Sequence, residues 1–228
     1  MKTSSLRPIL AAAALLSAAV AVQAQIRITE VAPWSSSSPV GDDWFELTNF
    51  GSSSVTITGW KMDDNSNSFS NAVPMSGISS IGAGESVIFI EAANNSASTD
   101  ATNFKNVWFG GTLPAGLQIG SYSGSGVGLS SSGDAVNVFN STGVLQANVS
   151  FGASPTGTTP TFDNAAGLNN TTISLLSVVG TNGAFVAPGD SHEIGSPGVI
   201  PEPSTYALLV GLASGAVVAI RRRFVRAA

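Results

Sequence analysis

Between residues 25 and 198 the sequence repeats one pattern, in which short runs of β-branched and aromatic residues are separated by clusters of Gly, Ser, Asn and Pro. No apolar stripe with the 3.6-residue period of a helix extends through this stretch. Short, regularly spaced runs of this kind are typical of all-β sandwiches and barrels. Seven segments fit a strand, which is enough for two packed sheets: residues 25–32, 43–50, 54–60, 85–92, 134–140, 144–151 and 171–179.

The sequence also predicts the position of one strand within its sheet and the connection between two others. The run Val87-Ile88-Phe89-Ile90 is apolar on both faces, so we expect it in the middle of a sheet. The turn Ser141-Thr142-Gly143 between the fifth and sixth segments predicts a hairpin. Residues 99–107 fit either one short helix or a loop, and the sequence leaves both open.

Composition excludes several classes of chemistry. The chain has no cysteine, which rules out a disulfide framework, a thiolate nucleophile and a Cys-ligated zinc. Its one histidine, His192, is too few for a multi-histidine metal site. Residues 25–200 contain three basic and thirteen acidic side chains, a net charge of −10. That charge repels phosphate backbones, so nucleic-acid binding is disfavoured.

Residues 1–24 read as a secretory signal peptide. Lys2 and Arg7 precede an apolar stretch, and small residues lead to an expected cleavage between Ala24 and Gln25. The alternative is an uncleaved membrane anchor, but the apolar run is short for a span, which needs about 20 residues. The Sec translocon and signal peptidase are the partners that this segment predicts, and the mature chain is expected to begin at Gln25.

Residues 199–228 predict a single membrane-spanning helix. Pro201-Glu202-Pro203 precedes an uncharged stretch over residues 204–220, and Arg221-Arg222-Arg223 follows it. Seventeen helical residues reach about 25 Å, slightly less than the ~30 Å hydrocarbon core, and interfacial side chains can cover the difference. The positive-inside rule places the arginines in the cytoplasm and the preceding residues outside it.

The order Pro-Glu-Pro, short apolar helix and arginine cluster resembles the PEP-CTERM sorting signal of Gram-negative bacteria. The resemblance implies that an exosortase recognises residues 199–228 and acts at Pro201-Glu202-Pro203. It also implies transient anchoring in the inner membrane with the body outside the cytoplasm, followed by delivery to the cell surface or an extracellular polysaccharide matrix. The alternative is a plain membrane anchor.

The body resembles a second family, the lamin-tail domain, an immunoglobulin-like β-sandwich. The segments that carry the resemblance are ITEVAP, DWFELTNFGSSSVTITGWKMDD, IGAGESVIFI and SGDAVNVFNSTGVLQANVSFG, with GSPG at residues 195–198 as the family's usual exit. The resemblance covers residues 25–198. Its most specific positions are Trp44, Glu46, Leu47, Asn49, Gly51, Val55, Ile57, Gly59 and Trp60.

Four tryptophans are the candidates for stacking on a sugar. Trp44 and Trp60 lie in strand-like runs and are expected in the core, whereas Trp34 and Trp108 lie beside Ser and Gly clusters and are expected as exposed platforms. Two long Ser/Gly-rich stretches, residues 66–80 and 93–128, are expected to be loops. A function that is specific to this chain and not shared by the family, such as polysaccharide binding, would lie in these loops.

No cofactor is predicted, and calcium is the alternative. Asp63, Asn65 and Asn67 place oxygen ligands at alternate positions, like the start of a calcium loop. Ser68 and Pro74 stand where an EF-hand-type loop requires Gly and Glu, so a solvated Asx-rich turn is the competing interpretation.

These observations predict a non-enzymatic, exported β-sandwich with a structural or adhesive role and no catalytic residues. The first alternative is a polysaccharide-binding protein that uses Trp34 or Trp108. The second is a secreted hydrolase, because paired carboxylates about 5–9.5 Å apart can hydrolyse glycosidic bonds. No other active-site signature accompanies the acidic residues.

Overall fold

The described part of the chain is built from many short strands and one helix. A computed structural model describes residues 26–33, 43–92, 97–155, 159–164 and 171–199. The strands are β1 Ile26–Ala32, β2 Trp44–Asn49, β3 Val55–Thr56, β4 Lys61–Asp63, β5 Val73–Ser76, β6 Ser80–Ile81, β7 Ser86–Glu91, β8 Gln118–Tyr122, β9 Asp134–Phe139, β10 Leu145–Phe151, β11 Thr159–Pro160, β12 Phe162–Asp163, β13 Thr172–Ile173, β14 Phe185–Val186 and β15 Glu193–Gly195, and the helix is α1 Ala97–Phe109.

Several predicted features lie outside these residues. They are the signal peptide, Trp34, Pro201-Glu202-Pro203, the apolar segment 204–220 and the arginine cluster. Within the part of the chain that the structure describes, no helix is long and apolar enough to cross a membrane.

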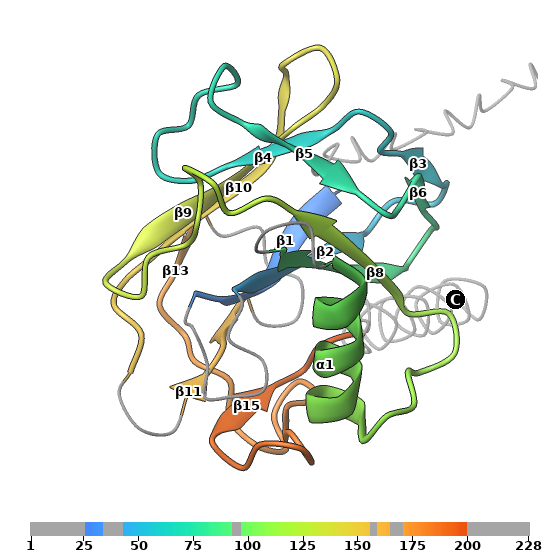
Figure 1. The fold of residues 1–228 in the computed structure, drawn as a ribbon, viewed down its shortest axis with the longest axis vertical. Helices are drawn as coiled ribbons and strands as arrows, with labels where there is room; N and C mark the ends of the chain where they lie inside the picture. The colour runs from blue at the N-terminus through green and yellow to red at the C-terminus, as the bar shows by residue number, and fades with distance from the viewer. Residues whose placement is uncertain (1–25, 34–42, 93–96, 156–158, 165–170, 200–228) are drawn as a thin grey trace, which may run out of the picture.

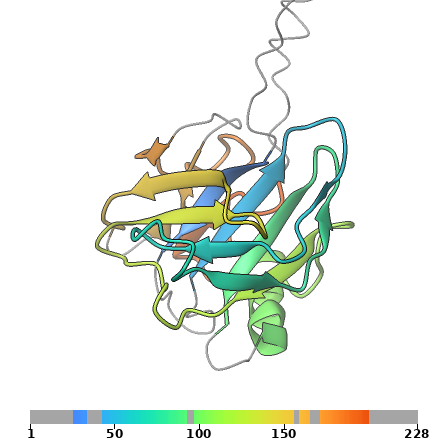
Figure 2. The same cartoon turned by 90° about the horizontal axis from the view of Figure 1, so that it is seen from above.

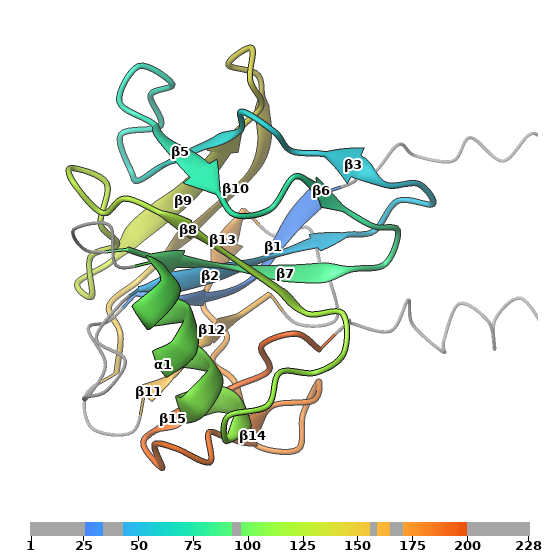
Figure 3. The same cartoon turned by 45° about the vertical axis from the view of Figure 1, so that its right-hand side comes forward.

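Ten strands form one hydrogen-bonded ladder in the order β12-β1-β2-β7-β8-β5-β4-β9-β10-β13. The ladder folds over on itself where β8 pairs with β5, with Met75 opposite Tyr122. Its two halves then lie face to face as layers (Figures 2 and 3), as expected for an immunoglobulin-like sandwich.

The main core fills the space between the two layers. Phe45, Leu47 and Phe89 come from one layer and Val136 and Val149 from the other, and all five are buried. Phe45 stacks on Phe89 with ring centroids 5.7 Å apart. The alternation of strand side chains sends every second residue of β2 and β7 into this core.

The other face of the first layer is also covered, which explains why every residue of β1 and β2 is buried. Helix α1 packs there, and its Phe104 and Trp108 join Trp44, Ile88 and Ile90 in a second apolar cluster. The predicted central position of Val87–Ile90 is therefore confirmed, since its side chains alternate between the two clusters.

Helix α1 is the link between two parallel strands. Strands β7 and β8 pair in parallel, with Phe89 opposite Gly120, and parallel neighbours need a crossover connection. Residues 97–109 supply it, so the helix that the sequence left open at 99–107 is present. The prediction of a long loop over residues 93–128 is wrong for α1 and β8, and the loop predicted over 66–80 contains β5 and the start of β6.

Two predicted strands are shorter than expected. Residues 54–60 contain only β3, because the chain turns at Gly59 with a positive φ of 78° and starts β4 at Lys61. Residues 171–179 contain only β13, since Val178 begins a turn in which the Thr181 amide donates to the Val178 carbonyl. The hairpin at Ser141–Gly143 is confirmed, with β9 and β10 antiparallel on either side of it.

The last part of the chain folds back onto the sandwich. Strand β12 pairs with β1, and a separate sheet in the order β11-β15-β14 lies on the same side of the first layer as α1 (Figures 1 and 3). Segments far apart in sequence thus cover the outer face of β1 and β2.

Candidate functional site

A one-residue bulge in β1 creates the most unusual site of the molecule. The register with β2 shifts between Ile28 and Glu30. Ile28 and Val31 both contact the inner core, so Thr29 and Glu30 between them turn to the outer face together. Without the bulge, strict alternation would place one of the two in the core.

Three acidic residues meet on that face. Glu30 lies directly opposite Glu46 on β2 and opposite Asp163 on β12. We call these residues the carboxylate row. Glu30 is 1% exposed, Glu46 2% and Asp163 8%. Like charges facing one another across strands are destabilising, so the row requires compensation from its surroundings.

Hydroxyl groups and amides supply that compensation for Glu46. The Thr29 hydroxyl donates to Glu46 Oε1 at 2.5 Å, and the Gly198 amide donates to Glu46 Oε2 at 2.6 Å. Thr29, Thr48 and Ser86 continue the polar row across β1, β2 and β7, with their hydroxyl oxygens 2.9 and 2.6 Å apart.

Glu30 is also held by the last part of the described chain. The Ser196 amide donates to Glu30 Oε1 at 2.8 Å, and the Ser196 hydroxyl lies 3.3 Å from Oε2. The Thr161 hydroxyl also donates to Oε1, and Ser177 lies 2.6 Å from Thr161. The segment Gly195–Gly198 is therefore fastened to the middle of the first layer, and we call it the exit segment.

Gly195 permits this close approach. A β-carbon at that position would lie 2.5 Å from Glu30 Oε1 and 2.9 Å from Trp108 Cη2. Only a residue without a side chain fits between the carboxylate and the indole.

Burial makes all three carboxyl groups hold their protons more tightly than usual. Burial raises the pKa of Glu46 to about 7, against the lowering effect of the Thr29 and Gly198 hydrogen bonds. Burial, and next the charge of Glu46, raise the pKa of Glu30 well above its ordinary value. Burial also raises the pKa of Asp163, while its hydrogen bond from Asn182 opposes the rise.

The chemistry open to this row is limited by its burial. Raised carboxyl pKa values occur at many catalytic sites, but a catalytic carboxyl group must also reach a substrate. The exit segment covers Glu30 and Glu46, and their oxygens are engaged by the protein's own hydroxyls and amides. The arrangement can bind the exit segment, and it responds to pH.

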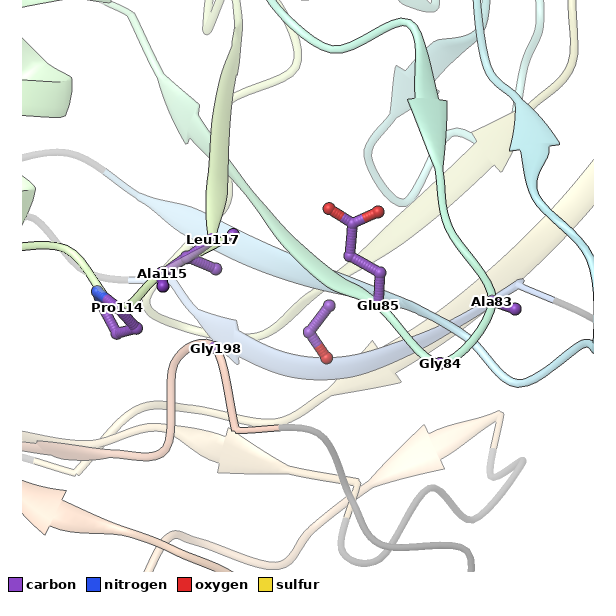
Figure 4. Close-up of a pocket in the computed structure, with 9 residues that line it drawn as sticks. Ala83, Gly84, Glu85, Pro114, Ala115, Leu117 and Gly198 are labelled. Atoms are coloured by element: carbon purple, nitrogen blue, oxygen red, sulfur yellow. The ribbon is translucent and has the colours of Figure 1, made fainter.

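A surface pocket of about 280 Å³ lies beside the exit segment. Figure 4 shows it between the turn Ala83–Ser86, residues Pro114–Leu117 and Gly198. Its one carboxylate, Glu85, accepts a hydrogen bond from the Gly82 amide at 2.5 Å and one from Gln118 Nε2 at 2.6 Å. Glu85 thus fixes the turn that precedes β7.

The prediction that Trp108 is an exposed platform is wrong. Trp108 is fully buried, with its ring centroid 5.5 Å from that of Trp44 and 5.9 Å from that of Phe185. Its Gly neighbours suggested a loop, but the tryptophan lies in the last turn of α1 and faces the sheet. Trp44 and Trp60 are buried, as predicted.

The loop that starts at Asp63 is organised by hydrogen bonds within the protein. Asp63 is fully buried, and its Oδ2 accepts from the Ser66 hydroxyl and the Ser68 amide, both at 2.7 Å. Asn65 and Asn67 are exposed, and the Asn65 amide donates to Asp134. Within the described ranges no three His, Asp or Glu side chains form a group that could hold a metal ion.

Asn49, one of the most specific positions of the resemblance, has a structural role. Asn49 is buried, its Nδ2 donates to the carbonyls of Ser53 and Ile81, and its Oδ1 accepts from the Gly51 amide.

The single histidine, His192, is exposed near the end of the described chain. Its Nδ1 lies 3.0 Å from Asp190 Oδ1.

Sequence reasoning did not single out Glu30. The sequence did contain one signal, the single carboxylate in the run ITEVA. Glu30 lies two residues after the core residue Ile28, where strand alternation points a side chain into the apolar core. The bulge that explains it depends on the pairing with β2.

Comparison with known proteins bears on the fold. No curated protein matches the chain. Residues 19–153 match the family model described as Lamin Tail Domain. The folded unit continues past that match, because β12 and β13 belong to the ten-stranded ladder and β11, β15 and β14 form the separate sheet beside it. Since the match spans more than half of the 228 residues and the fold is mostly β with one helix, this chain belongs to the lamin-tail-domain family.

Proposed function

We propose that this protein is an exported, surface-sorted β-sandwich with a non-catalytic structural or adhesive role. In this proposal residues 1–24 direct export and are removed after Ala24, and residues 199–228 are a PEP-CTERM signal. The segment 204–220 holds the chain in the inner membrane until an exosortase acts at Pro201-Glu202-Pro203.

The attachment of the exit segment is the observation that carries the proposal. Ser196 and Gly198 are bound to Glu30 and Glu46 immediately before the proposed sorting signal. A pulling force applied at residues 199–228 is therefore transmitted to β1 and β2, which are interior strands of the ladder. It does not act on an edge strand, which would separate from its neighbour more easily. Such an attachment suits a domain that is held at one end by an anchor.

The burial of the carboxylate row supports the non-catalytic part. Glu30 and Glu46 are the acidic pair with the most strongly raised pKa values among the described residues, and both are covered by the exit segment. Acting as a hydrolase's carboxylate pair would require both groups to be open to a glycan, and neither is exposed. The burial of Trp108 also removes one of the two aromatic platforms on which polysaccharide binding would depend.

Intact-mass measurement of the protein from the native cell surface tests the proposal. We expect a mature chain that begins at Gln25 and ends within a few residues of Glu202. Replacing Pro201-Glu202-Pro203 by three alanines should leave export intact and keep the body in the inner membrane.

The matched control replaces the neighbouring Ser204-Thr205 by two alanines, which leaves the tripeptide unchanged and should preserve sorting. Surface protein that still contains residues 204–228, or a tripeptide variant that is sorted normally, would refute the proposal.

A further inference from the structure

One stretch of the body has no charge although the body as a whole is strongly acidic. From Asn164 to Gly189 the sequence contains no Asp, Glu, Lys, Arg or His. Among the described residues of this stretch, four large aliphatic side chains are exposed, with Leu175 at 56%, Val178 at 61%, Val179 at 54% and Val186 at 42%. Two adjacent valines that are both more than half exposed are a feature that folding of the sandwich does not explain.

These valines begin a well-defined turn. The Thr181 amide donates to the Val178 carbonyl and the Gly180 amide to the Ala184 carbonyl. Asn182 Nδ2 donates to Asp163 Oδ2 at 3.2 Å, which ties the turn to the carboxylate row. We call residues 178–184 the valine turn. Its position on the body is therefore fixed by hydrogen bonds.

The valine turn lies against the point where the body ends. A β-carbon at Gly183 would be 2.7 Å from Val199 Cγ1, so the Val199 side chain packs directly over Gly183. Five residue steps separate Val199 from Ser204, where the proposed membrane segment begins. A fully extended chain spans at most about 3.6 Å per residue, so Val199 stays within about 18 Å of the membrane segment.

We propose that the valine turn is a membrane-contact surface, which rests on the bilayer interface while residues 204–220 anchor the chain. This inference rests on the proposed function, because it requires that anchor. Val178 and Val179 are the side chains that enter the interface, and Leu175 and Val186 flank them on the same uncharged stretch.

Charge favours a lipid surface as the occupant. Residues 25–200 carry a net charge of −10, and an anionic bilayer repels such a body over a Debye length of about 8 Å. An uncharged stretch approaches that bilayer without this repulsion, and exposed aliphatic side chains gain from leaving water.

A single label on the full chain tests the inference. Because the sequence has no cysteine, Val179→Cys provides one attachment site for an environment-sensitive fluorophore. Val144→Cys is the matched control, since Val144 is 56% exposed and its hairpin lies at the opposite end of the long axis from β14 (Figures 1 and 3). Both full-length proteins are reconstituted in vesicles of phosphatidylcholine and phosphatidylglycerol.

The experiment first measures whether each protein floats with the vesicles. It then measures how strongly nitroxide-labelled lipids quench the fluorophore. We expect both proteins to float with the vesicles, and the label at residue 179 to be quenched several-fold more than the label at residue 144. Equal quenching at the two positions, in protein that floats and melts like the unlabelled chain, overturns the inference and leaves the anchor standing.

Protein that does not float refutes the anchor itself, and with it the proposed function. If the label at residue 179 is shielded from water but not quenched by lipid, and oxidation links two Val179→Cys chains, the surface contacts a second copy and the membrane inference is wrong.

Discussion

Glu30 and Glu46 face each other across β1 and β2: the bulge at Thr29 turns the Glu30 carboxyl group to the outer side of the sheet, where the alternation of Phe45, Glu46 and Leu47 already places that of Glu46. Each is bound by one backbone amide of the exit segment, Ser196 for Glu30 and Gly198 for Glu46. A buried carboxylate is tolerated when hydrogen bonds replace its water, and here both backbone amides that do so lie more than 150 positions away in sequence.

The stability of the body should fall as the pH rises from about 5 to about 8. Burial raises the pKa of Glu46 from an ordinary 4.5 to about 7. Between these pH values the folded chain holds a proton on Glu46 that the unfolded chain has lost. The unfolded state then binds fewer protons, and the free energy of unfolding decreases with pH, by a few kcal/mol at most. Urea denaturation of residues 25–199 at several pH values measures this slope.

Glu46→Gln should reduce the slope, because the amide does not titrate, and the raised pKa values of Glu30 and Asp163 account for the slope that remains. Glu91→Gln on β7 is the control and should retain the slope of the unmodified protein. A free energy of unfolding that increases steadily across this range would contradict the assignment.

Gly195→Ala should destabilise the protein by about 1–3 kcal/mol, since the new methyl group overlaps Glu30 Oε1 and the Trp108 ring. Gly152→Ala is the matched control, because a β-carbon there has no heavy atom within 4 Å and should change stability by less than about 0.5 kcal/mol. Thermal unfolding compares the two. Equal midpoints would show that the exit segment does not contact the sheet as described.

Trp60→Ala and Trp108→Ala should each destabilise the protein by about 3–5 kcal/mol, because each removes a buried indole from a different apolar cluster. The measurement is chemical denaturation, with Val144→Ala as an exposed control. A Trp108→Ala protein as stable as the control would contradict the burial of Trp108 and support the exposed position that the sequence alone predicted.

Residues 25–199 expressed alone should unfold cooperatively, with a midpoint that EDTA does not change. The chain has no disulfide to form, and Asp63 of the suspected calcium loop already accepts hydrogen bonds from Ser66 and Ser68. Calorimetry with and without EDTA measures this. A lower midpoint in EDTA that calcium restores would establish the metal site at Asp63, Asn65 and Asn67.

The sequence by itself determined the parts of the fold that depend on neighbouring residues. The runs at Ile26–Ala32, Trp44–Asn49 and Ser86–Glu91 are strands, and Ser141–Gly143 joins a hairpin. Apolar alternation and turn-forming residues are local properties, so they are visible before the chain folds. The burial of Trp44 and Trp60 followed from their positions within such runs.

Only the tertiary structure decided the carboxylate row, the place of Trp108 and the shape of the C-terminal region. Glu30 meets Glu46 because of a bulge that exists only in the pairing of β1 with β2. Trp108 is buried because the parallel pairing of β7 and β8 requires a crossover that brings α1 onto the sheet. Strands β11–β15 are two or three residues long, too short for a periodic signal, and β11, β12 and β13 pair with strands distant in sequence. Such contacts depend on the whole chain having closed, and no local pattern encodes them.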